Sequence, residues 1–442
     1  MPRSNPAFRY PVILDRDHAR SRAAPAPPVE EFDAQATLLV YPVALGIWQR
    51  HRGAHLRERV LSLPILVGIL LSLIWRQMPS VSTLTRVLAR EPLLWVAPTT
   101  ITQQAIAKRL ETMPAQLFAE LWQELAPVLH QRAAQRPAFH PDLLAHVHPS
   151  YQRVWVLDSS RLEAVFKKSR AVSHQPGNVL GGTVTAVLDV GSHLPVQVWV
   201  DASATVNDRA ILPKLHERTP PGTILVLDRG FNRFASFDTV TEHGSAIVGR
   251  WTANWSFELL ETLSSGPTHL DQRVRLGTYR SNPCRHPVRR IGRLDQGQWH
   301  WWVTTECDPQ RLPAAHVIAL YDQRWRIEEA FLHIKRLLHL SYLWGSSANV
   351  VAVQVWTTIL VYGLLIDLCG EVGQALAVPA ERVSVEMTYR SLYHYARACQ
   401  QGEQRGLVVW LSDPAQADLG LIKRPRKRST TDIVTITNKL KL

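Results

Sequence analysis

The sequence predicts an α/β protein that contains a β-rich insertion and has helical regions on both sides of its core. Three observations carry this prediction. Short β-branched segments alternate with short helical ones between residues 146 and 250. Apolar residues recur at three- and four-residue intervals from about 36 to 145. Turn residues and alternating strands replace both patterns over 251–305.

The composition is that of a globular protein with a basic surface. The chain has 442 residues, 46% of them hydrophobic and 20% charged, which excludes wholesale disorder. The net charge of +13 favours a polyanionic partner such as nucleic acid, although a solvated basic surface would give the same figure. The four Cys lie far apart, so neither a zinc ribbon nor a disulfide framework is predicted.

A reducing compartment suits this cysteine usage, and the first twenty residues lack the apolar segment of a signal peptide. We therefore expect a cytoplasmic protein. Two uncharged apolar stretches, Val60 to Trp75 and Val350 to Ile366, need a membrane check. Both are at or below the length that spans about 30 Å of hydrocarbon, so they predict buried helices and no membrane association, with a membrane protein as the minority alternative.

The N-terminal third divides into a flexible tail and a helical region. Residues 1–35 are rich in Pro, Ala and Arg and predict a mobile tail. Residues 36–145 predict helices, among them VSTLTRVLAREPLLWV and a second one that begins at Thr99 or Thr100. Two such helices with a short Pro-containing turn would form a helix-turn-helix for DNA, but a plain helical subdomain has the same pattern.

Residues 146–250 predict the first part of the core. A strand YQRVWVLD ends at Asp158, and the β-type segments LEAVFKK, TVTAVLDV and PVQVWVDA follow it. A short helix, NDRAILPKLHER, leads through the Pro220 to Gly222 turn into the strand TILVLD, which ends at Asp228. The helix RFASFDTVTEHG and the strand SAIVGRW complete this α/β unit.

The insertion over 251–305 contains strands such as QRVRLGTYR and WHWWVTT between turn-rich segments. It holds seven Arg and no acidic residue between positions 273 and 293. Seven neighbouring cations repel each other unless a polyanion is present, so a DNA backbone surface is favoured over a solvated hairpin. Its members are Arg273, Arg275, Arg280, Arg285, Arg289, Arg290 and Arg293.

The second part of the core, 306–375, begins with one long predicted helix from about Pro313 to Leu340. At about 100° per residue, four of its polar side chains share an arc of about 60° beside an apolar stripe. They are Tyr321, Arg324, Glu328 and Lys335. Such a face can meet anions and a metal together, but an exposed helix face with an Arg–Glu pair four residues apart would have the same spacing.

Three carboxylates can converge in this arrangement. Asp158 and Asp228 end strands, where ligands bind in α/β sheets, and Glu328 lies on a helix packed nearby. Oxygen ligands without Cys or a His cluster suit magnesium, with manganese as a substitute. The reaction class is then metal-assisted phosphoryl transfer on DNA. Taken singly, each Asp is equally explained as a helix cap or a turn residue.

These residues resemble a known family. The spacing Tyr-x2-Arg-x3-Glu-x6-Lys over 321–335 and the Asp-Arg-Gly-aromatic segment at 228–231 are similar to those of bacterial insertion-sequence DDE transposases of the cut-and-paste group. Asp158 after an apolar strand and a β-rich insertion between Asp228 and Glu328 agree as well. The resemblance covers about 150–370, and it implies a ribonuclease-H-like catalytic core.

The resemblance also implies roles. Asp158, Asp228 and Glu328 would be catalytic and would bind the metal. The enzyme would bind the inverted repeats at the transposon ends, cleave them through a hairpin intermediate and join the 3′ ends to target DNA. Tyr321, Arg324 and Lys335 would hold phosphates, and the wider DNA-binding set would add Arg229, Arg273, Arg289, Arg290, Trp299 and Trp301.

A Trp of the insertion would stack on an extruded base in that family. The segment QWHWWVTTE offers Trp299, Trp301 and Trp302, whereas ungapped register with Glu328 places His300 at this position. Cross-strand packing is the alternative for each Trp.

The resemblance further implies a homodimer in the DNA complex and a bacterial, nucleoid-associated location. The C-terminal region, 376–442, predicts helix and ends in the basic run Lys423 to Arg428. Its segment VSVEMTYRSLYHYARACQ is a candidate partner surface, or it makes a local tertiary contact. The alternative function is a catalytically inactive or repurposed DNA-binding protein on the same scaffold.

Overall fold

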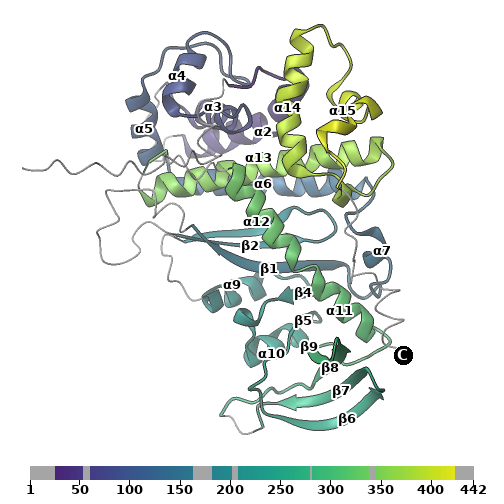
Figure 1. Ribbon diagram of the computed structural model, residues 1–442. Helices are drawn as coiled ribbons and strands as arrows, with labels where there is room; N and C mark the ends of the chain where they lie inside the picture. The colour runs from purple at the N-terminus through teal and green to yellow at the C-terminus, as the bar shows by residue number, and fades with distance from the viewer. Residues whose placement is uncertain are drawn as a thin grey trace, which may run out of the picture.

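The structure is a computed structural model in which a large mixed sheet lies between two helical layers (Figure 1). It describes residues 25–52, 60–162, 182–201, 208–278, 281–337, 344–345 and 347–423. The segment LEAVFKK from 163 onward, Arg280 and the basic run after Lys423 lie outside these ranges, so the predictions for them are not addressed by the structure.

Within the described ranges, the sheet has nine strands in the order β3-β2-β1-β4-β5-β9-β8-β7-β6. β1 pairs in parallel with β4 and β4 with β5, whereas β1–β2, β2–β3 and all pairs from β5–β9 outward are antiparallel. The strands are β1 (Arg153–Arg161), β2 (Thr183–Asp189), β3 (Pro195–Asp201), β4 (Thr223–Leu227), β5 (Ala246–Arg250), β6 (Phe257–Ser265), β7 (His269–Leu276), β8 (Val288–Asp295) and β9 (Gln298–Thr304).

The two faces of the sheet pack against different layers. Leu157, Leu225 and Leu227 lie on the face covered by η1 (Asp208–Ile211), α9 (Leu212–Arg218), η2 (Arg229–Phe231) and α10 (Phe234–Glu242). Val156 and Val226, one position earlier, belong to the larger core on the other face. That face is covered by α11 (Ala314–Asp322), α12 (Trp325–Leu337) and the flanking helices. The alternation of strand residues therefore decides which side chains meet α12.

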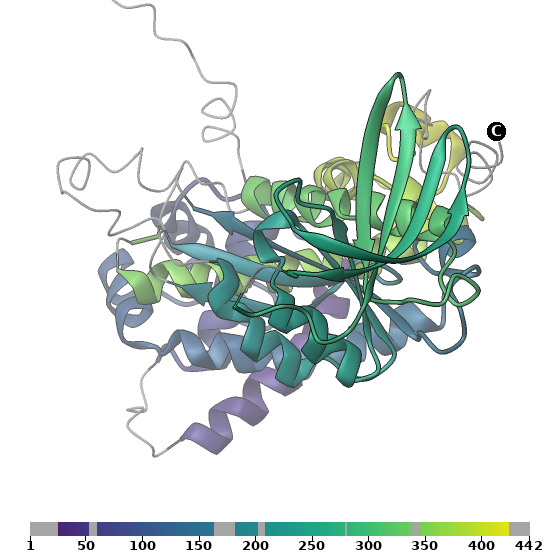
Figure 2. The same cartoon turned by 90° about the horizontal axis from the view of Figure 1, so that it is seen from below.

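The insertion is confirmed as β-rich, and it extends the core sheet directly. β9 pairs with β5, so strands β6–β9 continue the same sheet and curl away from the rest of the molecule (Figure 2). The predicted turn between β8 and β9 consists of Gln296 and Gly297, both with positive φ. A two-residue turn of this kind matches the twist of a hairpin.

The N-terminal helices cover the larger core. They are α2 (Glu30–His51), α3 (Leu63–Trp75), α4 (Val81–Leu88), α5 (Gln103–Thr112), α6 (Ala115–Ala134) and α7 (Pro141–Leu144). The predicted boundary of the tail at 35 is wrong, because α2 begins at Glu30 and Val29 is already buried. The helix-turn-helix of α4 and α5 is not formed either: residues 89–102 separate the two helices, and the cap of α5 is Thr102.

Both apolar stretches form buried helices, as predicted. α13 (Ala348–Ala375) is long and apolar enough to cross a membrane, but 83% of its most apolar window is buried inside the protein. The shorter α3 is buried along almost its whole length. A helix that is hydrophobic on all sides and surrounded by other helices is typical of the core of a large protein.

The C-terminal region contains η3 (Ala380–Arg382), α14 (Val385–Gln400), α15 (Leu407–Leu411) and η4 (Pro414–Leu419). The apolar face of α14 packs within the protein: Tyr389 donates to the carbonyl of Ile74, and the Tyr395 hydroxyl lies within hydrogen-bond distance of two acceptors, Glu31 Oε1 at 3.0 Å and the carbonyl of Arg405 at 2.8 Å. The local tertiary contact therefore explains this segment, and the predicted partner surface on its apolar face is not supported.

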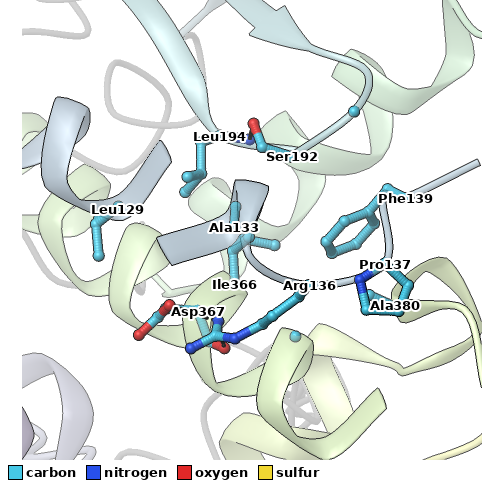
Figure 3. Close-up of a pocket in the computed structure, with 12 residues that line it drawn as sticks. Leu129, Ala133, Arg136, Pro137, Phe139, Ser192, Leu194, Ile366, Asp367 and Ala380 are labelled. Carbon is cyan, nitrogen blue, oxygen red and sulfur yellow. Dashed lines mark hydrogen bonds and ion pairs between the residues drawn. The ribbon is translucent and has the colours of Figure 1, made fainter. Parts of the chain in front are cut away.

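A buried ion cluster joins α6 to α13. Arg136 pairs with Asp367 at 2.6 Å and with Glu371 at 3.0 Å, and Arg132 contacts the same two acids. Beside it lies a small cavity between α6, α13 and the turn after β2, which Figure 3 shows with Phe139 on one side and Asp367 on the other. All four charges have partners, and Arg132 links α6 directly to Asp367 and Glu371 of α13.

Candidate active site

The two aspartates lie side by side on the sheet. The parallel pairing of β1 with β4 ends at Leu157 opposite Leu227, so Asp158 and Asp228 are the next residues on two neighbouring strands. Both point to the face of α12, because each follows a leucine that belongs to the other face. The prediction that the strand ends at Asp158 is wrong, since β1 continues to Arg161 through its antiparallel pairing with β2.

The predicted long helix is broken in two beside these aspartates. α11 ends at Asp322 and α12 begins at Trp325, with backbone bonds Gln323 N to Leu320 O and Arg324 N to Tyr321 O between them. Arg324 therefore lies in the connection, Tyr321 on α11, and Glu328 on the first turn of α12. α12 packs against β1, which brings Glu328 to the aspartates.

The guanidinium of Arg324 contacts all three carboxylates. Its Nη1 lies 3.8 Å from Asp158 Oδ2 and hydrogen bonds to Glu328 Oε1, and its Nε lies 3.9 Å from Asp228 Oδ1. Burial raises the pKa of Asp158 to about 6, while the Ser159 amide and Arg324 lower it. The structure thus brings together the three acids that the sequence singled out, around one cation.

The donor set fits a hard divalent cation. Asp158, Asp228 and Glu328 supply carboxylate oxygens only, which is the chemistry that magnesium and manganese prefer. Within the described ranges, no group of acidic, His or Cys side chains is arranged to hold a metal ion as it stands. The guanidinium of Arg324 lies between the three carboxylates and forms an ion pair with each of them.

Tyr321 and Lys335, the other two members of the signature, lie on α11 and α12. Tyr321 is half-buried, and burial raises the pKa of its hydroxyl. Lys335 lies on the last turns of α12 and is half-buried. Arg229 directly follows Asp228 and is exposed. Tyr321 and Arg229 therefore flank the carboxylates on the chain segments that carry them.

The arginines of the insertion are mostly paired with acids from other strands and helices. Arg273 pairs with Glu261 at 3.0 Å, and Arg275 pairs with Glu258 at 3.2 Å. Arg285 pairs with Glu242 on α10 at 2.9 Å. The expected repulsion within the arginine cluster is therefore offset inside the protein, and the argument from missing acids is wrong.

Arg289 is a clear correction. It was expected on a DNA surface, yet it is fully buried, and its Nε donates to Asp271 Oδ1 at 3.1 Å while Nη1 donates to the carbonyl of Leu312 at 2.6 Å. Arg290 is half-buried between rings, with its Cζ 3.6 Å from the ring centroid of Trp301 and 4.8 Å from that of Phe257. Of these two, only Arg290 keeps any exposed surface.

The tryptophans that were predicted to stack on a base lie on the face of the sheet opposite the three carboxylates. Trp299 and Trp301 stack on each other with their ring centroids 5.3 Å apart, and Trp301 packs against the core that faces α10. His300 and Trp302 alternate with them along β9 and so point to the opposite face. That face is the one of Tyr321, because the Arg250 Cζ lies between the two rings, 4.6 Å from the Trp302 centroid and 5.7 Å from the Tyr321 centroid. His300, the residue that ungapped register with Glu328 places at the stacking position, thus lies on the face of the carboxylates. Trp299 and Trp301 lie on the other face.

Sequence reasoning did not single out Arg250 and Trp325, which lie beside Tyr321 and Arg324, and it considered Arg293 only as part of the arginine cluster. Arg250 ends β5 and approaches His300 Nδ1 at 3.4 Å, while its Nη1 is buried and has no hydrogen-bond partner in the part of the chain that the structure describes. Arg293 is buried, and its Nε and Nη1 also have none among the described residues. Trp325 is 63% exposed and lies 5.2 Å from the Arg324 Cζ. Of these residues, only Trp325 gave a signal in the sequence, since a large aromatic residue there stands between Arg324 and Arg326.

Ion pairs of Glu329 anchor the side of α12 that faces away from the three carboxylates. Lys423 Nζ contacts Glu329 Oε1 at 2.8 Å, and Arg326 contacts the same carboxylate at 3.2 Å, so the cations hold the pKa of Glu329 down at about 2 against the effect of burial. Burial also lowers the pKa of His333 to about 4 and that of His140 to about 3. These buried groups fix the helix that carries Glu328.

The buried histidines predict a loss of stability in acid. A histidine with a lowered folded pKa binds fewer protons than the unfolded chain, so its contribution is complete above about pH 6.5 and is lost as the pH falls toward the folded pKa. We expect His333→Gln to flatten the pH dependence of the free energy of unfolding between pH 6.5 and 4 by on the order of 1 kcal/mol per pH unit. Urea titrations at several pH values measure this slope.

His148 provides the control, because it is exposed and its imidazole hydrogen bonds only to Ser150 among the described residues. His148→Gln should leave the slope unchanged. The readout is the difference between variant and wild type, because burial raises the pKa of Asp33 to about 7 and that group acts in the opposite direction. An unaltered slope in His333→Gln would show that His333, with Glu329, Lys423, Glu386 and Arg336 around it, is not held neutral.

Comparisons with known proteins agree with this geometry. Residues 150–364 match the family described as "Transposase DDE domain". A Sinorhizobium fredii protein named "Putative transposase y4zB" is 25% identical over 198 residues, which is 43% of this chain. The chain spans about half the length of that relative, 54%. The two similarities support a DDE transposase family.

Among solved structures, the cryo-EM structure of a piggyBac transposase synaptic complex with hairpin DNA is similar over 93% of this chain and 90% of that chain. The TM-score is 0.38 and the sequence identity is 11%. A similarity at this level does not establish a common fold.

Proposed function

We propose that this protein is a DNA transposase that cleaves the ends of its own element by metal-dependent phosphoryl transfer and joins the 3′ ends to target DNA, through a hairpin intermediate. The observation that carries the proposal is the meeting of Asp158, Asp228 and Glu328 around one cation in a region that matches the transposase DDE domain. These residues are far apart in the chain and share no structural task that requires three acids.

We propose that strands β1–β5 and helices α11–α12 form a ribonuclease-H-like core, which 251–305 interrupts. The order β3-β2-β1-β4-β5, with β1 parallel to β4 and antiparallel to β2, supports this. The helical region 36–145 would contribute DNA binding. It packs on α13 and lies on the same side of the sheet as α12 (Figure 1).

Asp158, Asp228 and Glu328 would hold the divalent metal, magnesium or manganese. When bound, such a cation neutralises charge on the phosphodiester and helps an attacking hydroxyl to lose its proton. The protein's own part is to fix three carboxylates on two strands and one helix. Water and, later, the freed 3′-hydroxyl would be the nucleophiles.

The DNA phosphates would lie along the cationic side of this centre. Tyr321, Arg324 and Lys335 remain the proposed phosphate ligands, and Arg229 is placed to join them. Arg250 adds a buried donor that has no partner among the described residues, which favours an external anion. His300 and Trp325 are the rings closest to these groups that a base could contact. Because cut-and-paste holds two ends together, we propose a homodimer on DNA.

The proposal is tested with the wild-type protein and a duplex that carries the ends of its own element. We expect nicks at the ends with magnesium or manganese and none when a chelator removes the metal. Denaturing gels resolve nicked strands from hairpins. A gel shift without nicks in either metal would favour the inactive DNA-binding protein and contradict the enzyme.

A further inference from the structure

We propose that Arg324 is an internal counter-ion that occupies the acidic centre when no metal is present, and that a divalent cation and a DNA phosphate therefore bind cooperatively. The cation displaces the arginine, and the phosphate accepts it. This inference rests on the proposed function, in which the same three carboxylates hold the metal.

The geometry is that of one cation serving three acids. In the part of the chain that the structure describes, Asp158, Asp228 and Glu328 each form their ion pair with Arg324. The Arg324 side chain is only 14% exposed, whereas Asp228 is 44% exposed. The arginine thus lies beneath a carboxylate that faces solvent, at the centre of the set.

A metal and this guanidinium exclude each other. Magnesium binds carboxylate oxygens at about 2.1 Å. Arg324 holds Asp158 and Asp228 oxygens 3.8 and 3.9 Å from its own nitrogens. A cation shared by these carboxylates would occupy the space that the guanidinium now fills, so the guanidinium must leave. Metal binding then costs the free energy of the three ion pairs with Arg324.

The displaced arginine has a suitable alternative partner when DNA is present. Its Nε is buried and has no hydrogen-bond partner among the described residues, and its Cζ lies 5.2 Å from the centroid of the Trp325 ring, which is exposed. A guanidinium donates two parallel bonds to a phosphate. A phosphate that accepts Arg324 relieves the centre of its counter-ion and so raises metal affinity, and the effect is reciprocal.

Arg326 offers a matched control. It lies two residues further along the same segment, and its guanidinium pairs with Glu329 at 3.2 Å on the other side of α12. Removing Arg326 deletes the same charge at nearly the same place in the chain without opening the acidic centre. Any general electrostatic effect of losing one cation should therefore appear in both variants.

The test titrates the full chain with manganese in the absence of DNA and follows free Mn²⁺ by electron paramagnetic resonance. We expect Arg324→Met to bind Mn²⁺ about tenfold more tightly than wild type, and Arg326→Met to bind it like wild type. A thermal melt checks folding, and Arg324→Gln replaces the Met variant if that variant does not fold. Binding by Arg324→Met that is no tighter than wild type would overturn the proposal.

A second titration adds a duplex with the ends of the element. Wild type should gain about tenfold in Mn²⁺ affinity on binding DNA, and Arg324→Met should gain much less. The Asp228→Asn substitution in the Arg324→Met background distinguishes an error in the proposed metal site from an error in the proposed displacement of Arg324. If it leaves Mn²⁺ binding intact, the proposed metal site itself is wrong. If it abolishes binding while Arg324→Met binds no more tightly than wild type, only the displacement by Arg324 is wrong.

Discussion

Replacing Glu328 by glutamine should lower the rate of DNA cleavage by about 10³-fold or more, because the amide removes one negative charge from a three-carboxylate centre. The fold should survive, since Glu328 is 35% exposed and its ion pair is with Arg324 four residues earlier. Single-turnover cleavage of an end duplex in manganese measures the loss. Circular dichroism shows whether the variant is folded.

Glu329→Gln is the matched control for this experiment. It makes the same change on the adjacent residue, whose carboxylate points to Lys423 and Arg326. We expect it to lower thermal stability and to leave cleavage within about threefold of wild type. Equal losses of activity in both variants would mean that Glu328 acts through the helix and not as a metal ligand.

The parts of the site that were predictable are those set by local alternation. The strand patterns bring Asp158 and Asp228 to neighbouring positions, because each follows the last parallel pair, Leu157 opposite Leu227, although β1 itself continues to Arg161. The signature spacing places Glu328 on a helix, and the structure confirms a helix there. The break before Trp325 was not predictable, since the segment contains neither Pro nor Gly.

What failed depends on contacts between distant segments. The insertion's arginines looked unpaired because their acids lie on other elements: Glu261 on β6, Asp271 on β7 and Glu242 on α10. The tryptophans of β9 were singled out through the family resemblance, although period-two alternation sends Trp299 and Trp301 to one face and His300 to the other. Which face meets α11 is set by the packing of the whole sheet.

Because Arg289 is buried in an ion pair with Asp271, its replacement should have a large effect on stability. Arg289→Met should lower the free energy of unfolding by about 3–5 kcal/mol, because it leaves the buried Asp271 carboxylate without its cation. The carbonyl of Leu312 loses its donor as well. Replacing both partners, Arg289→Met with Asp271→Leu, should recover much of the loss, since an apolar pair leaves no buried charge. Urea unfolding of the three proteins measures these differences.

DNA binding separates this structural role from the DNA role that was first expected. A residue that contacts phosphate contributes about one unit to the slope of log affinity against log salt concentration. The folded double variant at Arg289 and Asp271 should keep the wild-type slope, because Arg289 has no exposed surface. Arg273→Ala should reduce it, since Arg273 is 36% exposed and its partner Glu261 faces solvent as well. A reduced slope in the double variant would show that Arg289 becomes exposed on DNA and that the insertion rearranges there.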